Sequence, residues 1–247
     1  MTSAKQSSVA IVTGASRGIG AAIARCLVRD GFAVAVNYAS SSAEADALVA
    51  ELVQQGGRAI AVRGDVSKAD DVRGLYEAAE QQLGKVDVVV NNAGILKTVP
   101  LAQTGDELFA QTFAINVGGV FNMLREAAAR ISDGGRIINL SSTTLALNLP
   151  GYSIYNGTKA AVEAFTRVFA KELRGRRVTV NCVAPGPVAT DLFLNGKTDE
   201  QIAQFSKMSP LERLGQPDDI ANAVAFLAGP DGAWINGQVL RANGGLA

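Results

Sequence analysis

The sequence contains no histidine, only two cysteines and no long run of apolar residues. Without imidazole, a transition-metal site lacks its commonest ligand, and acid–base chemistry must rest on other side chains. Cys26 and Cys182 fall in a helical and a strand pattern, so we interpret both as small buried hydrophobic residues in a reducing compartment. No apolar run approaches about 18 residues, which argues against a membrane span. The first residues lack the apolar core and cleavage site of a signal peptide, so we expect a cytoplasmic location.

Net charge is also lacking, because 23 basic and 23 acidic residues balance to a formal charge of +0 with no clustered run of either sign. Nucleic-acid binding needs a basic patch to meet phosphates, so we do not expect it. What is present is an ordinary globular composition, 48% hydrophobic and 19% charged over 247 residues.

Apolar runs of strand length alternate with longer helical patterns. Strands are expected at VAIVTG (from Val9), AVAVNY (from Ala33), RAIAVRGDV, KVDVVVNNAG, GGRIINLSS (from Gly134), RRVTVNCVAPG and GQVLRANGG. Helices are expected near 18–30, up to about 55, at 68–83, 106–130, 152–173 and at PDDIANAVAFLA. The strands are nearly continuous apolar runs, as expected when both faces are covered. The sequence therefore predicts an α/β fold, a Rossmann-like doubly wound parallel sheet of about seven strands in a single domain over 1–247.

A glycine-rich turn, TGASRGIG, spans Thr13 to Gly20 directly after the first expected strand. Gly14, Gly18 and Gly20 would permit a tight turn and let backbone N–H groups approach a pyrophosphate at the positive end of the following helix. The alternative is that a strand-to-helix turn simply favours glycine.

The end of the second strand indicates which dinucleotide is bound. NAD-binding folds usually place an acid here for the ribose 2′-hydroxyl, yet no acid occurs between Gly31 and Ala43. Asn37, Ser40 and Ser41 stand there instead, with Arg17 available from the glycine turn. A guanidinium and hydroxyls suit a 2′-phosphate, which favours NADP(H), unless Arg17 is merely a solvated turn residue.

Two further polar stretches follow strands. Asp65 and Val66 come after the third strand and NNAG (Asn91 to Gly94) after the fourth, at the carboxyl ends where such sheets bind ligands. Asp65 or Ser67 could equally cap the next helix.

Tyr155 and Lys159 are four residues apart in an expected helix and therefore share one of its faces. Taken alone, the pair is also consistent with a surface contact in which the lysine stem packs on the ring.

With these motifs in order, the chain resembles the short-chain dehydrogenase/reductase family over nearly its whole length. The resemblance rests on TGASRGIG, GDV, NNAG, INVGG, NLSS, YNGTK and APGPVAT. PLERLGQPDDIANAVAFLA particularly resembles 3-oxoacyl-[acyl-carrier-protein] reductases and related bacterial carbonyl reductases. Thr158 stands where serine is common before the lysine.

The resemblance implies a catalytic set of Asn116, Ser142, Tyr155 and Lys159, the serine lying thirteen residues before the tyrosine. Tyr155 would donate the proton, Lys159 would lower the pKa of the phenol and hold the nicotinamide ribose, Ser142 would bind the carbonyl, and Asn116 would support a water chain. The expected cofactor-binding residues are Gly14, Ser16, Arg17, Gly18, Ile19, Gly20, Asn37, Ser40, Ser41, Asp65, Val66, Asn92, Ala93, Gly94, Tyr155, Lys159, Pro185, Gly186, Val188 and Thr190. No metal is expected.

The segment at about 190–211 follows the nicotinamide motif, and we expect it to cover the substrate as a lid. Its apolar residues are Leu192, Phe193, Leu194, Phe205 and Met208, and those of the opposite wall are Leu145, Leu147, Leu149 and Tyr152. Those that are not core would favour an apolar ketone or acyl chain. An acyl carrier protein would need an exposed basic patch, for which the candidates are Arg125, Arg130, Arg174, Arg176 and Arg177, unless these are ordinary surface charges.

The main hypothesis is an NADPH-dependent reductase of a ketone or 3-oxoacyl-type carbonyl. The alternatives are an NAD(P)-dependent alcohol, sugar or steroid dehydrogenase, and a non-catalytic cofactor-sensing protein. The resemblance also implies a homotetramer that pairs the helices carrying Asn116 and Tyr155, for which the alanine-rich stretches REAAAR and KAAVEAFTRVFA give independent support only if they are not simply good helix formers.

Overall fold

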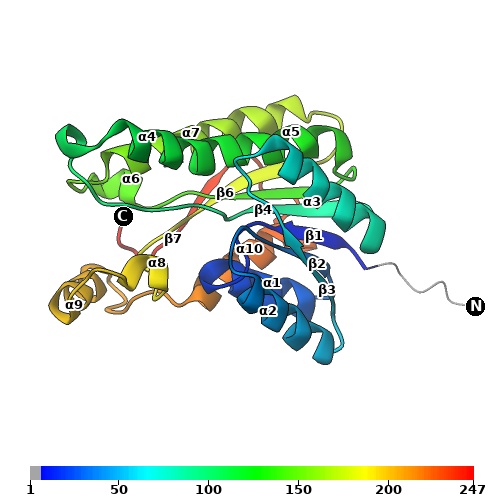
Figure 1. Ribbon diagram of the computed structural model, residues 1–247, viewed down its shortest axis with the longest axis horizontal. Coiled ribbons are helices and arrows are strands. Elements are labelled where there is room, and N and C mark those ends of the chain that lie inside the picture. The colour runs from blue at the N-terminus through cyan, green and yellow to red at the C-terminus, as the bar shows by residue number, and fades with distance from the viewer. Residues whose placement is uncertain (1–6) are drawn as a thin grey trace, which may run out of the picture.

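The computed structural model describes residues 7–247, in which a parallel sheet is covered by helices on both faces (Figure 1). The strands are β1 (Val9–Val12), β2 (Ala33–Tyr38), β3 (Arg58–Arg63), β4 (Val86–Asn91), β5 (Arg136–Leu140), β6 (Thr179–Pro185) and β7 (Val239–Ala242). They are ordered β3-β2-β1-β4-β5-β6-β7, and all neighbouring pairs are parallel. The predicted fold class and the number of strands are confirmed.

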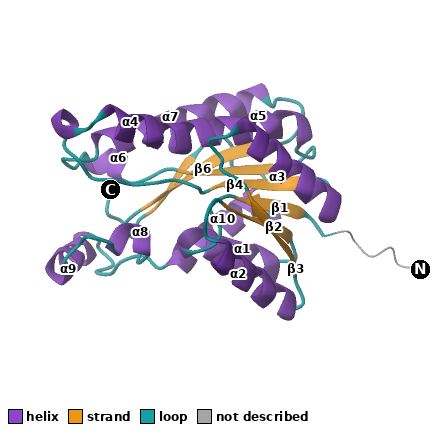
Figure 2. Cartoon of the chain, viewed as in Figure 1, coloured by secondary structure: helices purple, strands orange, loops and turns teal. Residues whose placement is uncertain are grey.

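The helices that cover the sheet form two layers, one on each side of it (Figure 2). One layer contains α1 (Gly18–Arg29), α2 (Ser42–Gln54) and α10 (Pro217–Ala228), and the other contains α3 (Ala69–Gln82), α4 (Asp106–Phe113), α5 (Gly119–Arg130) and α7 (Ser153–Glu172). The short elements are η1 (Leu101–Gln103), η2 (Ala114–Gly118), α6 (Thr144–Leu147), α8 (Asp191–Leu194), α9 (Asp199–Met208) and η3 (Pro230–Gly232).

The central strand β1 illustrates why the sheet is buried. Successive side chains on a strand point to opposite faces. Ala10 and Val12 pack in the core beneath α1, α2 and α10, whereas Val9 and Ile11 pack in the core beneath α3, α5 and α7. All four residues are buried, which is why the strand has to be apolar along its whole length.

The strand order reverses between β1 and β4, so the turns that leave these two strands diverge to opposite faces. A crevice opens at such a switch point, beyond the carboxyl ends of the strands. The glycine-rich turn follows β1 and NNAG ends β4, so the fold brings together two motifs that are far apart in the sequence.

Three elements differ from the sequence-based expectation. The single helix expected over 106–130 is interrupted by η2, a π-helical turn that contains Asn116. No helix was expected between the sixth strand and PDDIANAVAFLA, but the segment after the sixth strand contains α8 and α9. A short helix, α6, precedes α7 and ends at Asn148, which has the left-handed conformation (φ 53°).

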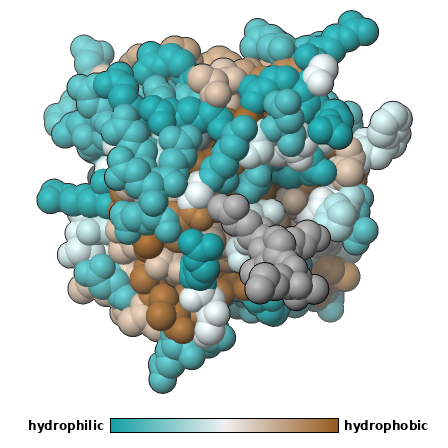
Figure 3. All heavy atoms as spheres, turned by 90° about the vertical axis from the view of Figure 1, so that its right-hand side faces the viewer, coloured by the Kyte–Doolittle hydropathy of each residue, from teal (hydrophilic) through white to brown (hydrophobic). Residues whose placement is uncertain are grey.

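The face of the molecule at which the strands begin carries mostly hydrophilic side chains, with small hydrophobic areas between them (Figure 3). None of the helices within residues 7–247 combines the length and hydrophobicity needed to cross a bilayer.

Candidate active site

Two adjoining hollows lie at the carboxyl ends of the strands. The first, a groove, runs from the glycine-rich turn past the ends of β2, β3 and β4. The second, a cavity of about 900 Å³ that is partly open to solvent, lies between the start of α7 and the α8–α9 segment. Ile19, Asn92 and Thr190 line both of them, so the two hollows communicate.

The glycine-rich turn leaves no space for side chains where the groove begins. Gly14 has a left-handed backbone (φ 60°), and a Cβ atom there would lie 2.9 Å from the Cα of Ala93. A Cβ atom on Gly20 would lie 2.4 Å from the backbone oxygen of Gly14. Close packing of the turn, the first helix and the fourth strand therefore requires glycine at both positions.

Thr13 and Asn92 fasten this turn to the end of β4. The Thr13 hydroxyl accepts hydrogen bonds from the backbone N–H groups of Asn92 and Ala93 at 3.0 and 3.1 Å. The Asn92 amide donates to the carbonyl oxygens of Thr13 and Gly14 at 2.9 and 3.0 Å. The floor of the groove is thus held by hydrogen bonds from both motifs.

The start of α1 is suited to an anion. Arg17 is its N-cap residue, and within the described chain no side chain caps the first turn of the helix. Unsatisfied N–H groups at the positive end of a helix favour a phosphate. Together with the narrow approach at Gly14 and Gly20, this fits the pyrophosphate of a nicotinamide dinucleotide.

Asn37 has a different place from the one expected at the 2′-phosphate end. Its side chain is buried, its Oδ1 accepts from the backbone N–H of Gly14 at 3.3 Å, and its Nδ2 donates to the carbonyl oxygens of Val62 and Gly64. The amide is therefore occupied in holding the glycine-rich turn. Arg17 and Ser40 are exposed beside the groove and are the groups left to meet a phosphate.

Asp65 lines the groove next to Val66, but it does not cap α3. Its Oδ1 accepts from the backbone N–H and the hydroxyl of Ser67 at 3.0 and 2.7 Å, which closes a local turn. The N-cap of α3 is Lys68, without a side-chain cap, so the expectation that Asp65 or Ser67 caps this helix is wrong.

The structure gathers the predicted cofactor residues around these two hollows. The groove is lined by Gly14, Ser16, Arg17, Gly18, Ile19, Gly20, Asn37, Ser40, Ser41, Asp65, Val66, Asn92, Ala93, Gly94 and Thr190. The cavity is lined by Tyr155, Lys159, Pro185, Gly186, Val188 and, again, Thr190. The residues that the sequence reasoning missed are Tyr38, Ala39, Gly64, Ile95, Ile115, Asp191 and Asn195 in the groove and Leu96, Leu140, Ser141, Thr143, Thr144 and Pro187 in the cavity. Most adjoin a motif, which is the signal that would have found them.

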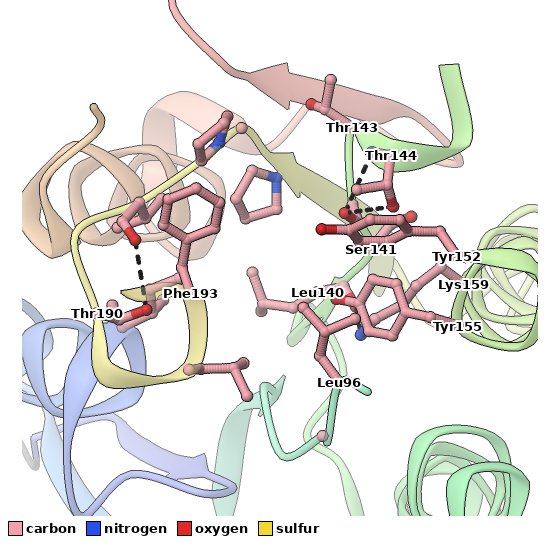
Figure 4. Close-up of a pocket in the computed structure, with 18 of the residues that line it drawn as sticks. Leu96, Leu140, Ser141, Thr143, Thr144, Tyr152, Tyr155, Lys159, Thr190 and Phe193 are labelled. Atoms are coloured by element: carbon pink, nitrogen blue, oxygen red, sulfur yellow. Dashed lines mark hydrogen bonds between the residues drawn. The ribbon is translucent and has the colours of Figure 1, made fainter. Parts of the chain in front are cut away.

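Tyr155 and Lys159 lie together on one wall of the cavity (Figure 4). The Lys159 Nζ is 5.5 Å from the centre of the Tyr155 ring and donates a hydrogen bond of 2.7 Å to the carbonyl oxygen of Leu140. The shared helical face predicted from their spacing is therefore present, and the lysine is buried rather than part of a surface pair.

The pKa values of this pair differ from the expected direction. Desolvation by the surrounding protein raises the pKa of Tyr155 to about 12, against a smaller lowering by a hydrogen bond with Ser142. Burial lowers the pKa of Lys159 to about 8. In the chain by itself the net pKa of the phenol is raised, because desolvation outweighs the Lys159 ammonium, which is turned toward the carbonyl oxygen of Leu140.

Ser142 follows the carboxyl end of β5 and lines the cavity beside Tyr155. The neighbouring hydroxyls are bound elsewhere: Ser141 donates to Glu163 Oε1 at 2.8 Å and Thr143 donates to the carbonyl oxygen of Ala184 at 3.1 Å. The hydroxyls of Ser141 and Thr143 are therefore occupied by other partners, and Ser142 stays the predicted catalytic serine.

Asn116 joins the loop after β4 to α7. Its Oδ1 accepts from the backbone N–H of Ile95 at 2.9 Å, and its Nδ2 donates to the carbonyl oxygen of Ile95 and to the Thr158 hydroxyl. Thr158 in turn donates to the carbonyl oxygen of Tyr155 at 2.7 Å. The hydroxyl at position 158 therefore links Asn116 to the helical turn that carries the tyrosine.

The remaining wall of the cavity is apolar. Its lining includes Leu96 from the loop after β4, Leu147, Leu149 and Tyr152 from α6 and the segment before α7, and Leu192, Phe193 and Phe205 from α8 and α9. Figure 4 shows Phe193 across the cavity from Tyr152 and Tyr155. The rings of Phe193 and Phe205 pack edge to face, with 5.2 Å between the ring centres. Of the other expected wall residues, Leu145, Leu194 and Met208 do not line this cavity.

The arginines considered for an acyl carrier protein lie away from the cavity. Arg130 ends α5 and is paired with Glu80 and Glu126 at 2.7 and 2.9 Å. Arg176 pairs with Asp133 near the start of β5 and β6, at the opposite edge of the sheet. Arg174 and Arg177 also precede β6, and Arg125 lies over the Phe121 ring on α5.

With this geometry in place, we compared the chain with known proteins. A family model described as enoyl-(acyl carrier protein) reductase matches residues 14–247. An uncharacterized oxidoreductase of Methylorubrum extorquens is 47% identical over 240 residues, covering 96% of this chain and 97% of its own. An NADPH-dependent aldehyde reductase-like chloroplastic protein of Arabidopsis thaliana is 43% identical, covering 96% and 93%.

Solved structures with the same fold are also similar in sequence. A short-chain dehydrogenase/reductase from Serratia marcescens superposes with a TM-score of 0.93 at 36% identity, covering 98% of both chains. The crystal structure of a blue fluorescent protein from a metagenomic library, in complex with NADPH, superposes with a TM-score of 0.92 at 42% identity, covering 97% of this chain and 98% of that one.

Proposed function

Because this chain belongs to the short-chain dehydrogenase/reductase family, we propose that it is an NADPH-dependent reductase of ketone-type carbonyls in which Tyr155 donates the proton. The observation that carries the proposal is the cluster of Tyr155, Lys159 and Ser142 on the wall where the groove opens into the cavity. Two related proteins support the choice of cofactor, because the blue fluorescent protein was crystallised with NADPH and the Arabidopsis relative is named as NADPH-dependent.

In this mechanism the chain's own residues handle the carbonyl oxygen. NADPH, when bound, supplies the hydride. Ser142 donates a hydrogen bond that fixes the carbonyl oxygen within reach of the phenol. Tyr155 transfers its proton to that oxygen as negative charge develops. Lys159, whose Nζ lies 5.5 Å from the ring centre, stabilises the tyrosinate that remains.

The pKa of Tyr155 favours work in the reductive direction. A phenol with a pKa raised to about 12 keeps its proton at neutral pH and is therefore ready to act as an acid. An alkoxide is a much stronger base than a phenolate, so proton transfer to the product oxygen stays downhill. An enzyme that oxidises an alcohol needs tyrosinate as its base, and the buried environment of Tyr155 disfavours tyrosinate.

We propose that Asn116 and Lys159 help to return a proton to Tyr155. Lys159 is buried and Asn116 is fixed by both backbone groups of Ile95, so both hold constant positions next to Gly94. A water chain past these side chains would restore the Tyr155 proton after each turnover.

The apolar wall supports a ketone or 3-oxoacyl substrate without a charged group. Apart from Lys159, no charged side chain of the described residues lines the cavity. We propose that the segment 190–211, with α8 and α9, acts as the lid of this catalytic domain. The arginines at the opposite edge of the sheet give no support to an acyl carrier protein as partner, so a free ketone or thioester is the preferred substrate.

Assembly as a homotetramer and a cytoplasmic location remain proposals. Exposed apolar side chains on the outer helices support the assembly, because Phe121 is 49% and Val168 is 55% exposed on α5 and α7. Light scattering of the purified protein and of Phe121→Glu tests it, since a charge on this face should split the oligomer.

The decisive experiment compares the wild type with Tyr155→Phe. We expect NADPH oxidation with ketones to fall by about 10²–10⁴-fold, because only the proton donor is removed. NADPH binding, followed by nicotinamide fluorescence, should change little. Full reductase activity in Tyr155→Phe would refute the mechanism.

A substrate and cofactor panel separates the alternatives. The proposal predicts that kcat/KM is higher with NADPH than with NADH, and higher for simple ketones or acetoacetyl thioesters than for alcohol oxidation. An enoyl thioester tests the description of the matching family model. Tight NADPH binding without turnover of any substrate would favour the cofactor-sensing alternative.

A further inference from the structure

A chain of hydrogen bonds connects Ser142 to two side chains outside the catalytic set. The Thr144 hydroxyl lies 2.9 Å from Ser142 Oγ and 2.7 Å from Asn156 Oδ1. The Thr144 backbone N–H also donates to Ser142 Oγ at 3.2 Å. Thr144 lines the cavity (Figure 4), and Asn156 is the residue after Tyr155 on α7.

The direction of the chain follows from counting hydrogens. The Asn156 Nδ2 donates to the carbonyl oxygen of Thr144 at 3.0 Å, which fixes the orientation of the amide and turns its oxygen toward the Thr144 hydroxyl. An amide oxygen can only accept, so Thr144 must donate its single hydroxyl hydrogen to Asn156. Thr144 Oγ1 is then an acceptor for Ser142, and the Ser142 hydrogen points at Thr144.

This arrangement leaves Ser142 Oγ with one free lone pair on the side of the cavity. Ser142 is buried, so a hydroxyl rotated elsewhere would lose partners that water cannot replace. Building on the proposed function, we infer that Thr144 and Asn156 are positioning residues that fix the rotamer of Ser142 and hold its Oγ in place.

The inference gives Ser142 two states. Before the substrate binds, its hydrogen is directed at Thr144 Oγ1 and its free lone pair faces the phenol. When a carbonyl oxygen enters, the Ser142 hydrogen turns to that oxygen and the Thr144 hydroxyl turns its own hydrogen from Asn156 Oδ1 to Ser142 Oγ, while the Thr144 N–H keeps Ser142 Oγ in place. The exchange replaces one hydrogen bond by another and moves no heavy atom, so it costs little.

A purely structural alternative is that Asn156 and Thr144 only fasten α6 to the start of α7. This alternative and the inference differ in one respect: a fastening acts on the whole wall, whereas positioning acts only through the Ser142 hydroxyl. A double-mutant cycle with Ser142→Ala therefore separates them.

The test measures kcat and KM with NADPH and a ketone for Thr144→Val, Thr144→Ser and Asn156→Leu, each with Ser142 and with Ser142→Ala. In the Ser142 background we expect kcat to fall about tenfold in Thr144→Val and severalfold in Asn156→Leu, with KM nearly unchanged. Thr144→Ser, which keeps the hydroxyl, should retain wild-type kcat within about twofold. In the Ser142→Ala background the same changes should have less than about a twofold effect.

Three outcomes would overturn the inference. Equal losses in both backgrounds, or a loss in Thr144→Ser as large as in Thr144→Val, would assign the chain a structural role, and thermal unfolding of each variant would show the matching loss of stability. Full activity of Thr144→Val would remove any role. If Ser142→Ala itself keeps wild-type activity, the failure lies with the proposed function and not with Thr144.

Discussion

The groove and the cavity are built in different ways, although they share a border. The groove is formed by backbone at the ends of parallel strands, with Asn37 and Asn92 using their side chains to hold it together. The cavity is formed by side chains such as Phe193 and Phe205 on two short helices after β6. Where backbone atoms line a site, its shape selects the ligand and few substitutions can change it. Where side chains line a site, each substitution can change which ligand is preferred.

Lys159 stands where the two hollows meet, and its replacement by methionine should have the largest effect. We expect reduction to fall about 1,000-fold, because the tyrosinate loses its counter-charge. In wild type, loss of the ammonium proton near its pKa of about 8 should make the reduction rate fall as pH rises above 8. Initial rates between pH 6 and 10 check both expectations, and an unchanged rate up to pH 10 would contradict the assignment.

The same variant carries a stability prediction with a defined sign. The pKa of Lys159 is lowered from 10.5 to about 8 on folding, so between these values the unfolded chain holds a proton that the folded protein has released. Relative to Lys159→Met, the free energy of unfolding of wild type should therefore rise with pH across that window. Lys159→Met should lack this rise and be more stable at pH 7 by about 1–2 kcal/mol. Urea denaturation at pH 7 and 10 measures it.

Gly20→Ala tests whether the groove is set by backbone packing. The added methyl group would lie 2.4 Å from the Gly14 oxygen and 2.8 Å from the Cα of Ala15, neither of which can turn away. We expect a loss of about 2–3 kcal/mol in the free energy of unfolding and a weaker affinity for NADPH. Gly74→Ala is the matched control, because a methyl group there meets nothing within 4 Å on α3, and it should stabilise by about 0.5–1 kcal/mol. Similar destabilisation by both changes would count against the argument.

Arg17→Gln tests the part of the groove where we expect a side chain to discriminate between NADPH and NADH. Arg17 is exposed at the start of α1, and its guanidinium is the charge available to a 2′-phosphate. We expect KM for NADPH to rise about tenfold while that for NADH stays the same. Steady-state kinetics with both cofactors at a saturating ketone measure this, and equal changes for both would assign Arg17 no part in the discrimination.

Phe205→Ala should have the smallest effect, and it tests the comparison of groove and cavity from the side of the cavity. The ring packs edge to face on Phe193 at 5.2 Å, so its loss opens the wall formed by α9. We expect KM for apolar ketones to rise about three- to tenfold, with the affinity for NADPH unchanged. A change in NADPH affinity without a change in ketone KM would reverse the proposed division between the two hollows.

The same contrast explains how much the sequence predicts. β1, α1 and the glycine-rich turn were predicted almost to the residue, because alternation of apolar strands and helices, and glycine at a tight turn, are local signals. The gathering of Ser142, Tyr155 and Lys159 followed from family resemblance together with helical spacing. These parts depend on neighbours in sequence or on the order of the strands.

The parts that sequence reasoning missed depend on local capping or on burial. Helix α9 begins with Thr198 and Gln201, whose side chains form a capping box, a pattern that was present in the sequence and overlooked. The pKa of Tyr155 could not be derived from its spacing to Lys159, because desolvation, which no spacing reveals, outweighs the charge. The hydrogen bonds of Asn37 likewise appear only when β3 lies beside it.

The π-helical turn at Ala114–Gly118 has a consequence for insertions and deletions. A wider turn accommodates one residue more than an α-helical turn, and each residue advances an α-helix by about 100°. Removing a single residue from this turn would let α4 and α5 merge into a regular helix and rotate everything beyond it by that angle. Met123 and Leu124 would then swing out of the core, so this stretch, apart from Asn116, should tolerate substitution far better than any change in length.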